Sequence, residues 1–291
     1  MRYNDANTYF KNRFGHKMYK AAISLNVTCP NRDGSKGTGG CAFCSAGGSG
    51  EFAADKIKSV TQQIDEAVTR LSKKVTKETG YIAYFQSFTG TYCDPDHLRR
   101  GLEEAASHPK VEALAVGTRP DCLPEDILYV LKDVSAKIPL FVELGLQTSD
   151  DKIAESFGRC YETKEYIKAV KDLHEAGCEV ITHIIFGLPG ESSEGMLRSV
   201  QTAVDAGTDG VKFTCLYILK NTRYEKMWEE GKIEVMGQEE YFDLVESALN
   251  ILPSEVIVHR ITGDGPKRLL LAPMWTANKR NVINYINKRF S

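Results

Sequence analysis

The chain has 291 residues, of which 42% are hydrophobic and 26% are charged, a composition typical of one large or two small globular α/β domains. It has no run of about 18 apolar residues and no apolar signal core at its start, so we expect a cytoplasmic protein without a membrane span. The net charge is −2, but residues 1–20 carry +4 and residues 256–291 carry +6, which leaves −12 in between.

Basic ends on an acidic body indicate a polyanionic partner, because Lys and Arg displace counterions when they bind phosphates. In the first twenty residues the basic side chains alternate with aromatic ones, namely Tyr3, Tyr9, Phe10, Phe14 and Tyr19. Such a pattern can stack on unpaired bases. The alternative is a solvated terminus with a few packing aromatics, and the sequence leaves both interpretations open.

Short apolar segments alternate with longer amphipathic ones along most of the chain. The predicted strands are residues 21–25, 81–85, 111–116, 140–146, 179–186 and 210–217. The predicted helices are one that begins at Ser59, followed by residues 96–107, 124–137, 150–157, 163–176 and 192–206. This alternation predicts βαβ units around a parallel sheet. Six such units make a partial (β/α)6 TIM-like barrel, which is shorter than a closed eight-unit barrel.

After residue 217 the pattern changes, with predicted helices at 222–230 and 238–250, a strand at 256–261 and a basic helix at 277–290. We therefore divide the chain into a basic aromatic N-terminal segment (1–20), the partial barrel (21–218) and a C-terminal extension (219–291). Ligands of such folds bind at the carboxyl ends of the strands.

Three cysteines follow the first predicted strand with the spacing C-x11-C-x2-C: Cys29, Cys41 and Cys44. A chain without a secretion signal favours reduced thiols and metal ligation over disulfides. A structural zinc site normally closes with four protein ligands, whereas three thiolates leave one iron of a four-iron cluster free. From these cysteines alone an iron–sulfur cluster, zinc and simple burial all remain open.

The cysteine loop and three strand-end motifs together resemble the radical S-adenosylmethionine (SAM) superfamily. Phe43 stands where that family has an aromatic residue, and the long cysteine spacing is similar to the subgroup of the Elongator catalytic subunit. The supporting motifs are residues 118–121, 142–148 and 187–191. Without an acetyltransferase domain, the chain looks like the bacterial stand-alone relatives associated with wobble-uridine modification in tRNA.

This resemblance implies a [4Fe–4S] cluster on Cys29, Cys41 and Cys44, with SAM bound at the free iron. It implies a 5′-deoxyadenosyl radical as the oxidant and a one-electron donor such as flavodoxin or ferredoxin. For the tRNA-linked relatives the expected reaction converts 5-carboxymethylaminomethyl-(2-thio)uridine to 5-aminomethyl-(2-thio)uridine.

The resemblance also assigns candidate cofactor contacts. The polar residues Gln86, Ser87 and Thr89 stand where relatives contact the methionine amino group. Gln147 and Arg159 lie twelve residues apart, as do a Gln and an Arg in oxygen-independent coproporphyrinogen oxidases, so Arg159 would pair with the methionine carboxylate. The alternatives are a satisfied strand end for Gln147 and a surface ion pair for Arg159.

Four further residues are candidates for the chemistry. His183 takes the place of an Asp in those relatives, or it is a core histidine. Glu143 is expected to point into the barrel, where a carboxylate needs a partner. Cys93 and Cys160 fall near strand ends, so they either quench radicals or are structural. The candidates for contact with substrate or tRNA phosphates are Lys212, His259, Arg260, Lys267, Arg268, Lys279 and Arg280.

Three hypotheses therefore remain: a radical SAM enzyme acting on a tRNA wobble uridine, a radical SAM enzyme acting on a small acid, and a zinc-stabilised RNA-binding module. Iron content and 5′-deoxyadenosine release separate the first two from the third. The salt dependence of tRNA binding separates the first from the second.

Overall fold

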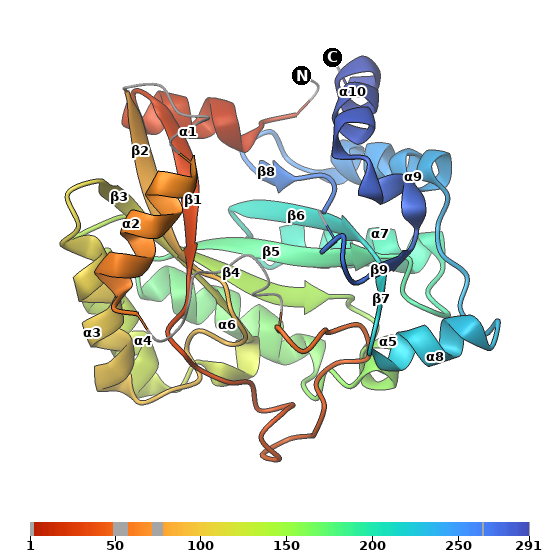
Figure 1. Ribbon diagram of the computed structural model, residues 1–291, viewed down its shortest axis with the longest axis horizontal. Helices are drawn as coiled ribbons and strands as arrows, with labels where there is room; N and C mark the ends of the chain where they lie inside the picture. Colours follow the sequence, from red (N-terminus) through yellow and green to blue (C-terminus); the bar gives the residue numbers. More distant parts are fainter. Residues whose placement is uncertain (1–2, 49–57, 72–77, 264, 291) are drawn as a thin grey trace.

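The computed structural model describes residues 3–48, 58–71, 78–263 and 265–290. Seven parallel strands form one curved sheet in the order β1-β2-β3-β4-β5-β6-β8 (Figure 1). The prediction of an α/β fold with an incomplete barrel is confirmed. The strands are β1 (Lys17–Ile23), β2 (Thr79–Phe85), β3 (Val111–Thr118), β4 (Leu140–Gln147), β5 (Glu179–Phe186), β6 (Gly210–Cys215) and β8 (Ile257–Arg260).

Helices cover the convex face of this sheet because each carries one apolar stripe. In α4, for example, Ile127, Val130, Leu131 and Val134 recur every three or four residues, and all are buried against the sheet and its neighbours. Burial of each such side chain stabilises the fold by about 1.5–3 kcal/mol. The helices of the barrel are α2 (Val60–Leu71), α3 (Pro95–Ala106), α4 (Glu125–Ser135), α5 (Asp151–Phe157), α6 (Thr163–Glu175) and α7 (Ser193–Asp205), with a 3₁₀ turn, η2 (Pro120–Cys122).

The sheet has one strand more than the six that we predicted. β8, which we assigned to the C-terminal extension, pairs in parallel with β6, with Val258 opposite Val211. β1 also begins at Lys17, so the predicted boundary at residue 20 falls inside it. Alternation along residues 256–261 marks a strand but contains no information about its partner, because that pairing joins segments far apart in the sequence.

The N-terminal helix α1 (Ala6–Phe14) lies across the amino-terminal end of the barrel, where it contacts both edge strands, β1 and β8. Phe10 packs edge-on against Phe141 of β4, with ring centroids 5.7 Å apart. Tyr9 donates a hydrogen bond to Glu179 at 2.7 Å. The N-terminal aromatics are therefore packing residues, and the idea that they stack on unpaired bases is wrong for Phe10, which is buried.

The C-terminal part continues from the carboxyl end of β6. β7 (Ile218–Leu219) pairs with β9 (Leu270–Ala272), and the remaining elements are α8 (Arg223–Glu229), α9 (Gln238–Ile251), η3 (Met274–Ala277) and α10 (Lys279–Phe290). Tyr3 contacts Phe290 with ring centroids 6.3 Å apart, so the two chain ends lie together (Figure 1). Within the described ranges, every helix is too short or too polar to cross a bilayer.

Candidate active site

The cysteine loop begins beyond the carboxyl end of β1 and is fastened to the segment that follows α5. Asn31 Nδ2 donates to Gly158 O at 2.6 Å and lies 3.3 Å from Cys41 Sγ. The Ala42 N–H donates to Phe157 O at 2.9 Å. The Asn31 amide thus connects Cys41 of the loop to the end of α5.

A buried charge network supports the other end of the loop. Arg119 donates to both carboxylate oxygens of Asp121 at 2.8 Å, and Lys36 contacts the same carboxylate at 2.6 Å. Although burial acts in the opposite direction, these two cations hold the pKa of Asp121 below its usual value. Arg119 Nη1 also lies 3.8 Å from Cys29 Sγ, so a fixed positive charge is placed beside a thiol of the loop.

The three thiols lie within electrostatic reach of one another. Burial, followed by the neighbouring Cys44 and Cys29, raises the pKa of Cys41 to about 12, although Asn31 and Arg119 act in the opposite direction. Three thiolates so close together need a compensating positive charge, which an iron cluster supplies. Over the described residues, no three His, Cys, Asp or Glu side chains are arranged to hold a single metal ion. Three cysteine thiolates are a donor set that suits a cluster in which each thiolate binds a separate iron.

Phe43 packs beside this loop, with its ring 5.2 Å from that of Phe157 and 6.5 Å from that of Tyr224. It joins the loop to α5 and α8 through an apolar cluster separate from the main core. We infer that it anchors Cys44 and still borders the site.

The polar segment after β2 lies next to the cysteine loop. Thr89 N–H donates to Thr28 O at 3.3 Å, and Gln86 N–H donates to Ile23 O at 3.2 Å. Ser87 and Thr89 are buried, whereas Gln86 is half-buried. The structure thus brings Gln86, Ser87 and Thr89 to the carboxyl ends of β1 and β2, as the sequence predicts.

Glu143 lies in the middle of the concave face and is fully enclosed, with its side chain 0% exposed. Its carboxylate accepts hydrogen bonds from Lys20, Tyr84 and Lys212, and His183 Nε2 lies 2.9 Å away. Burial opposes ionisation, but the two lysines and His183 hold the pKa of Glu143 well below its usual value. The Glu143 carboxylate is therefore ionised, and four neighbouring side chains already contact it.

His183 and Lys212 are paired opposite each other on β5 and β6. Burial and the charge of Lys212 lower the pKa of His183 to about 4, so its imidazole is neutral at pH 7. Burial, Lys20 and Arg260 likewise lower the pKa of Lys212 well below its usual value. His183 therefore belongs to a polar layer inside the barrel, rather than to the apolar core that we considered as its alternative.

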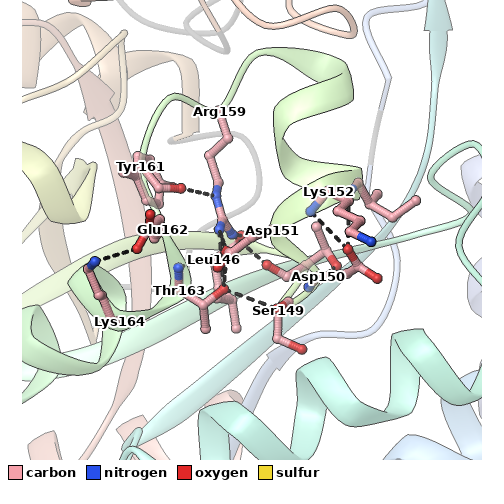
Figure 2. Close-up of polar contacts among 12 residues, drawn as sticks. Leu146, Ser149, Asp150, Asp151, Lys152, Arg159, Tyr161, Glu162, Thr163 and Lys164 are labelled. Carbon is pink, nitrogen blue, oxygen red and sulfur yellow. Dashed lines mark hydrogen bonds and ion pairs between the residues drawn. The ribbon is translucent and has the colours of Figure 1, made fainter.

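Arg159 is one of the most completely engaged side chains in the structure (Figure 2). Its five N–H groups donate to Tyr161 O at 3.0 Å, Leu146 O at 2.8 Å, Thr148 O at 2.5 Å, Asp151 Oδ1 at 2.6 Å and Thr163 Oγ1 at 3.2 Å. The side chain is 1% exposed. With every donor occupied, Arg159 has a structural role in this geometry, in place of the cofactor contact that we expected.

Gln147, by contrast, folds back over the sheet. It ends β4 with φ +61° and accepts a hydrogen bond from Tyr161 Oη at 3.1 Å. A Cβ on Gly145 would come within 2.3 Å of Gln147 Nε2, so the glycine leaves room for this amide. Gln147 therefore remains a candidate contact at the carboxyl end of the sheet, without Arg159 beside it.

The two further cysteines lie in different places. Cys160 is exposed, and its Sγ lies 3.3 Å from Gly158 O, the carbonyl that also binds Asn31. Cys160 is therefore beside the cysteine loop. Cys93 lines a pocket of ≈ 670 Å³ between the loop and the outer helices, and burial raises its pKa to about 11. It is away from Glu143 and His183.

The predicted substrate contacts separate into three groups. Lys212 and Arg260 lie opposite each other on β6 and β8 at the level of His183. His259 packs against Phe10, with ring centroids 5.7 Å apart, and so lies at the end of the barrel that α1 covers. The substrate contact of His259 stays a prediction, since its imidazole also lies within electrostatic reach of Lys20, Lys212 and Glu143. Lys267, Arg268, Lys279 and Arg280 are all exposed.

Four residues that we did not predict complete this arrangement: Lys20, Tyr84, Asn31 and Arg119. Lys20 and Tyr84 could have been found from strand alternation, since each lies two positions after an apolar residue of the concave face, Met18 or Ile82. Asn31 and Arg119 carry no comparable signal, because their partners come from distant segments.

Comparison with known proteins agrees with the fold. A model of the Radical SAM superfamily matches residues 27–223, and one of the Radical_SAM C-terminal domain matches residues 208–291. The uncharacterized protein YtqA of Bacillus subtilis is 40% identical over 287 residues, which cover 99% of this chain and 89% of that protein. A tRNA uridine(34) acetyltransferase of Methanocaldococcus infernus is 29% identical over 193 residues, 65% of this chain and 35% of that protein.

Among solved structures, the Elp3 protein of Methanocaldococcus infernus with an N-terminal deletion superimposes with a TM-score of 0.69 at 19% identity. The match covers 94% of this chain and 63% of that one. The fold of the whole described chain is therefore shared, while the larger archaeal protein contains further sequence that this chain does not match.

Proposed function

The chain belongs to the radical SAM superfamily, and from this premise we propose that it modifies the wobble uridine of tRNA. Its cofactors are a [4Fe–4S] cluster and SAM. Membership of this superfamily also excludes the third hypothesis, a zinc-stabilised RNA-binding module. The observation that carries the tRNA substrate is the match to a tRNA uridine(34) acetyltransferase through 193 residues.

We assign the cluster to Cys29, Cys41 and Cys44; this is supported by the electrostatic effect of Cys44 and Cys29 on the Cys41 thiol. When bound, the cluster and SAM supply a carbon-centred radical that removes a hydrogen atom from the substrate. Asn31 and Arg119 position Cys41 and Cys29. The backbone of residues 86–89 forms the neighbouring wall, where we place the methionine end of SAM.

Exposed basic residues support a tRNA partner. Lys267 and Arg268 lie in the connection between β8 and β9. Lys220 N–H donates to Leu269 O at 2.8 Å, so this connection lies next to the segment that leaves the carboxyl end of β6. Positive charge near that end of the barrel suits a phosphate backbone. On α10, Lys279 and Arg280 are exposed. Arg289, near the end of the same helix, is paired with Asp243 and Glu246.

We propose that the reaction converts the 5-carboxymethylaminomethyl side chain of the uridine to 5-aminomethyl. The SAM-derived radical would remove one hydrogen atom from the carboxymethyl methylene, and an acceptor such as the oxidised cluster would take one further electron, which leaves an imine. Water would then break the C–N bond, release the two carbons as glyoxylate and leave a primary amine. This choice follows the resemblance to stand-alone relatives linked to that modification, and the similarity to YtqA covers 99% of this chain and 89% of that protein.

Mass spectrometry of nucleosides from total tRNA tests the proposal. Deletion of the gene should accumulate the carboxymethylaminomethyl nucleoside and deplete the aminomethyl one. The wild-type gene and Cys178→Ala should restore the profile, whereas Cys41→Ala should not, because Cys178 is buried beyond the end of α6, outside the cysteine loop. An unchanged nucleoside profile after deletion would reject this substrate.

A small acidic substrate is the second candidate, and the polar layer around Glu143 favours it, because its cations could hold such an acid without RNA. Binding of bulk tRNA at increasing salt separates the two. A steep linear fall of log affinity with log salt supports the RNA substrate. Absence of measurable tRNA binding at low salt favours the small acid.

A further inference from the structure

Cations outnumber carboxylates on the concave face of the barrel. Lys20 of β1, Lys212 of β6 and Arg260 of β8 surround the polar centre, and we call these three residues the cationic layer. Within the described part of the chain, Glu143 is the carboxylate in contact with the two lysines. Its Oε2 also accepts from Tyr84 and lies 2.9 Å from His183 Nε2, so four side chains already contact this carboxylate.

The like charges of the cationic layer act on one another. Lys20 and Arg260 both disfavour the charged form of Lys212, whose side chain is only 5% exposed. His183 and His259 add no negative charge, and Tyr84 is held neutral by burial and by Glu143. A second anion at this place would lower the electrostatic cost of keeping three cations together.

Solvent reaches this layer from inside the barrel. The side chain of Lys20 is 26% exposed and that of His183 is 35% exposed, although both point to the concave face. Ala22 and Thr214 are the next inward positions after Lys20 and Lys212, and Gly117 lies opposite Glu143. All three residues are small and partly exposed. A Cβ on Gly117 would meet its neighbours at no less than 3.5 Å, so the strand is not crowded there.

The amino-terminal side of the layer is closed. Met18, Ile82 and Phe141 form the next inward level, and Phe10 of α1 packs against them. An anion can therefore approach the cationic layer from the carboxyl ends, where the cysteine loop lies, or from the open edge between β1 and β8, but not through α1.

We propose that Lys20 and Lys212, assisted by Arg260, bind a carboxylate carried by the substrate. The inference rests on the proposed function, in which the uridine side chain ends in a carboxymethyl group. The carboxylate of this side chain would lie against the cationic layer, and the methylene group next to the carboxylate would face the cysteine loop. Glu143 serves this site indirectly, since it contacts both lysines and positions them.

Two anticodon stem–loop RNAs test the inference, one with 5-carboxymethylaminomethyluridine and one with 5-aminomethyluridine at the wobble position. Fluorescence anisotropy with the anaerobic holoenzyme should show about tenfold tighter binding of the carboxylate-bearing RNA, the effect of one charge-assisted contact. Lys20→Met should abolish this preference. Lys17→Met, on the outer face of the same strand, should retain it, although it removes the same charge.

The outcomes separate this inference from the proposed function. If both RNAs bind and Lys20→Met keeps the full preference for the carboxylate-bearing RNA, the cationic layer does not bind the carboxylate. This result overturns the inference. If Lys20→Met instead weakens SAM binding alone, the layer belongs to the cofactor, which also overturns it.

If neither RNA binds, the proposed tRNA substrate fails, and a small probe decides the inference by itself. Malonate should raise the melting temperature of the wild type and of Lys17→Met more than malonamide does at equal ionic strength, and Lys20→Met should lose that difference. Equal melting temperatures for the wild type in malonate and malonamide would overturn the carboxylate site.

Discussion

The guanidinium of Arg159 donates to the backbone carbonyl of Leu146 at 2.8 Å, so the segment after α5 holds the carboxyl end of β4 in place. The same Nη1 also donates to Thr148 O at 2.5 Å. These two carbonyls flank Gln147, whose φ of +61° departs from strand geometry. Arg159 thereby positions Gln147 through the backbone rather than by contact with a ligand.

Replacement of Arg159 by Lys should therefore destabilise the protein. Lysine has three donors instead of five, so at least two buried acceptors lose their partner, at a cost of about 2–5 kcal/mol. Urea unfolding measures the free energy, with Arg100→Lys on the exposed face of α3 as the matched control. If Arg159→Lys instead keeps wild-type stability but loses SAM binding, Arg159 has the cofactor role that the sequence indicated.

Cys41→Ala should contain little cluster iron after anaerobic reconstitution, because two remaining thiolates hold a four-iron cluster poorly. Cys178→Ala also removes a buried thiol but should keep wild-type iron and sulfide content, since Cys178 lies outside the loop. Iron and sulfide analysis checks both variants. Equal iron in the two would show that Cys41 is not a ligand.

Glu143→Gln should be destabilised by about 3–5 kcal/mol at neutral pH, because it leaves Lys20 and Lys212 without their counter-ion. Glu143→Leu combined with Lys212→Met should recover part of the loss. Glu103→Gln, an exposed acidic position on α3, is the control. A stable but inactive Glu143→Gln would instead point to a direct role in the reaction.

The lowered pKa of His183 predicts a pH dependence of stability. Burial, followed by the charge of Lys212, lowers this pKa from 6.5 to about 4, so the folded protein binds fewer protons than the unfolded chain between these values. The stabilising contribution is complete above pH 6.5 and is lost as the pH falls toward 4. Urea unfolding across this range should give a shallower pH slope for His183→Gln than for the wild type. Parallel slopes would contradict the assignment.

The double variant Lys267→Ala/Arg268→Ala should bind tRNA more weakly and reduce the slope of log affinity against log salt by about 1.5, as expected for two lost phosphate contacts. Lys164→Ala/Lys171→Ala removes two equally exposed charges from α6 on the outer face of the barrel and should leave the slope unchanged. Equal slopes for both double variants would place the RNA elsewhere.

The sequence contains local information, and the local predictions are the ones that succeeded. The period of apolar residues marked the helices of the outer layer and all seven strands of the sheet, because each pattern needs only a dozen neighbouring residues. It did not show that the strand at 256–261 joins the barrel. The C-x11-C-x2-C spacing is also local, but by itself it left an iron–sulfur cluster, zinc and simple burial open. The family then followed from motifs at several strand ends taken together.

Tertiary structure decided everything that depends on distant partners. It paired β8 with β6 and placed α1 across the amino-terminal end of the barrel. It also brought backbone and side-chain acceptors to all five N–H groups of Arg159. It also gathered Lys20, Glu143 and Lys212 from three separate strands into one polar layer. The sequence by itself determined which elements form and which metal chemistry they favour. Which charges meet inside the barrel was settled only by folding, because the energy of a buried charge depends on neighbours that local sequence does not contain.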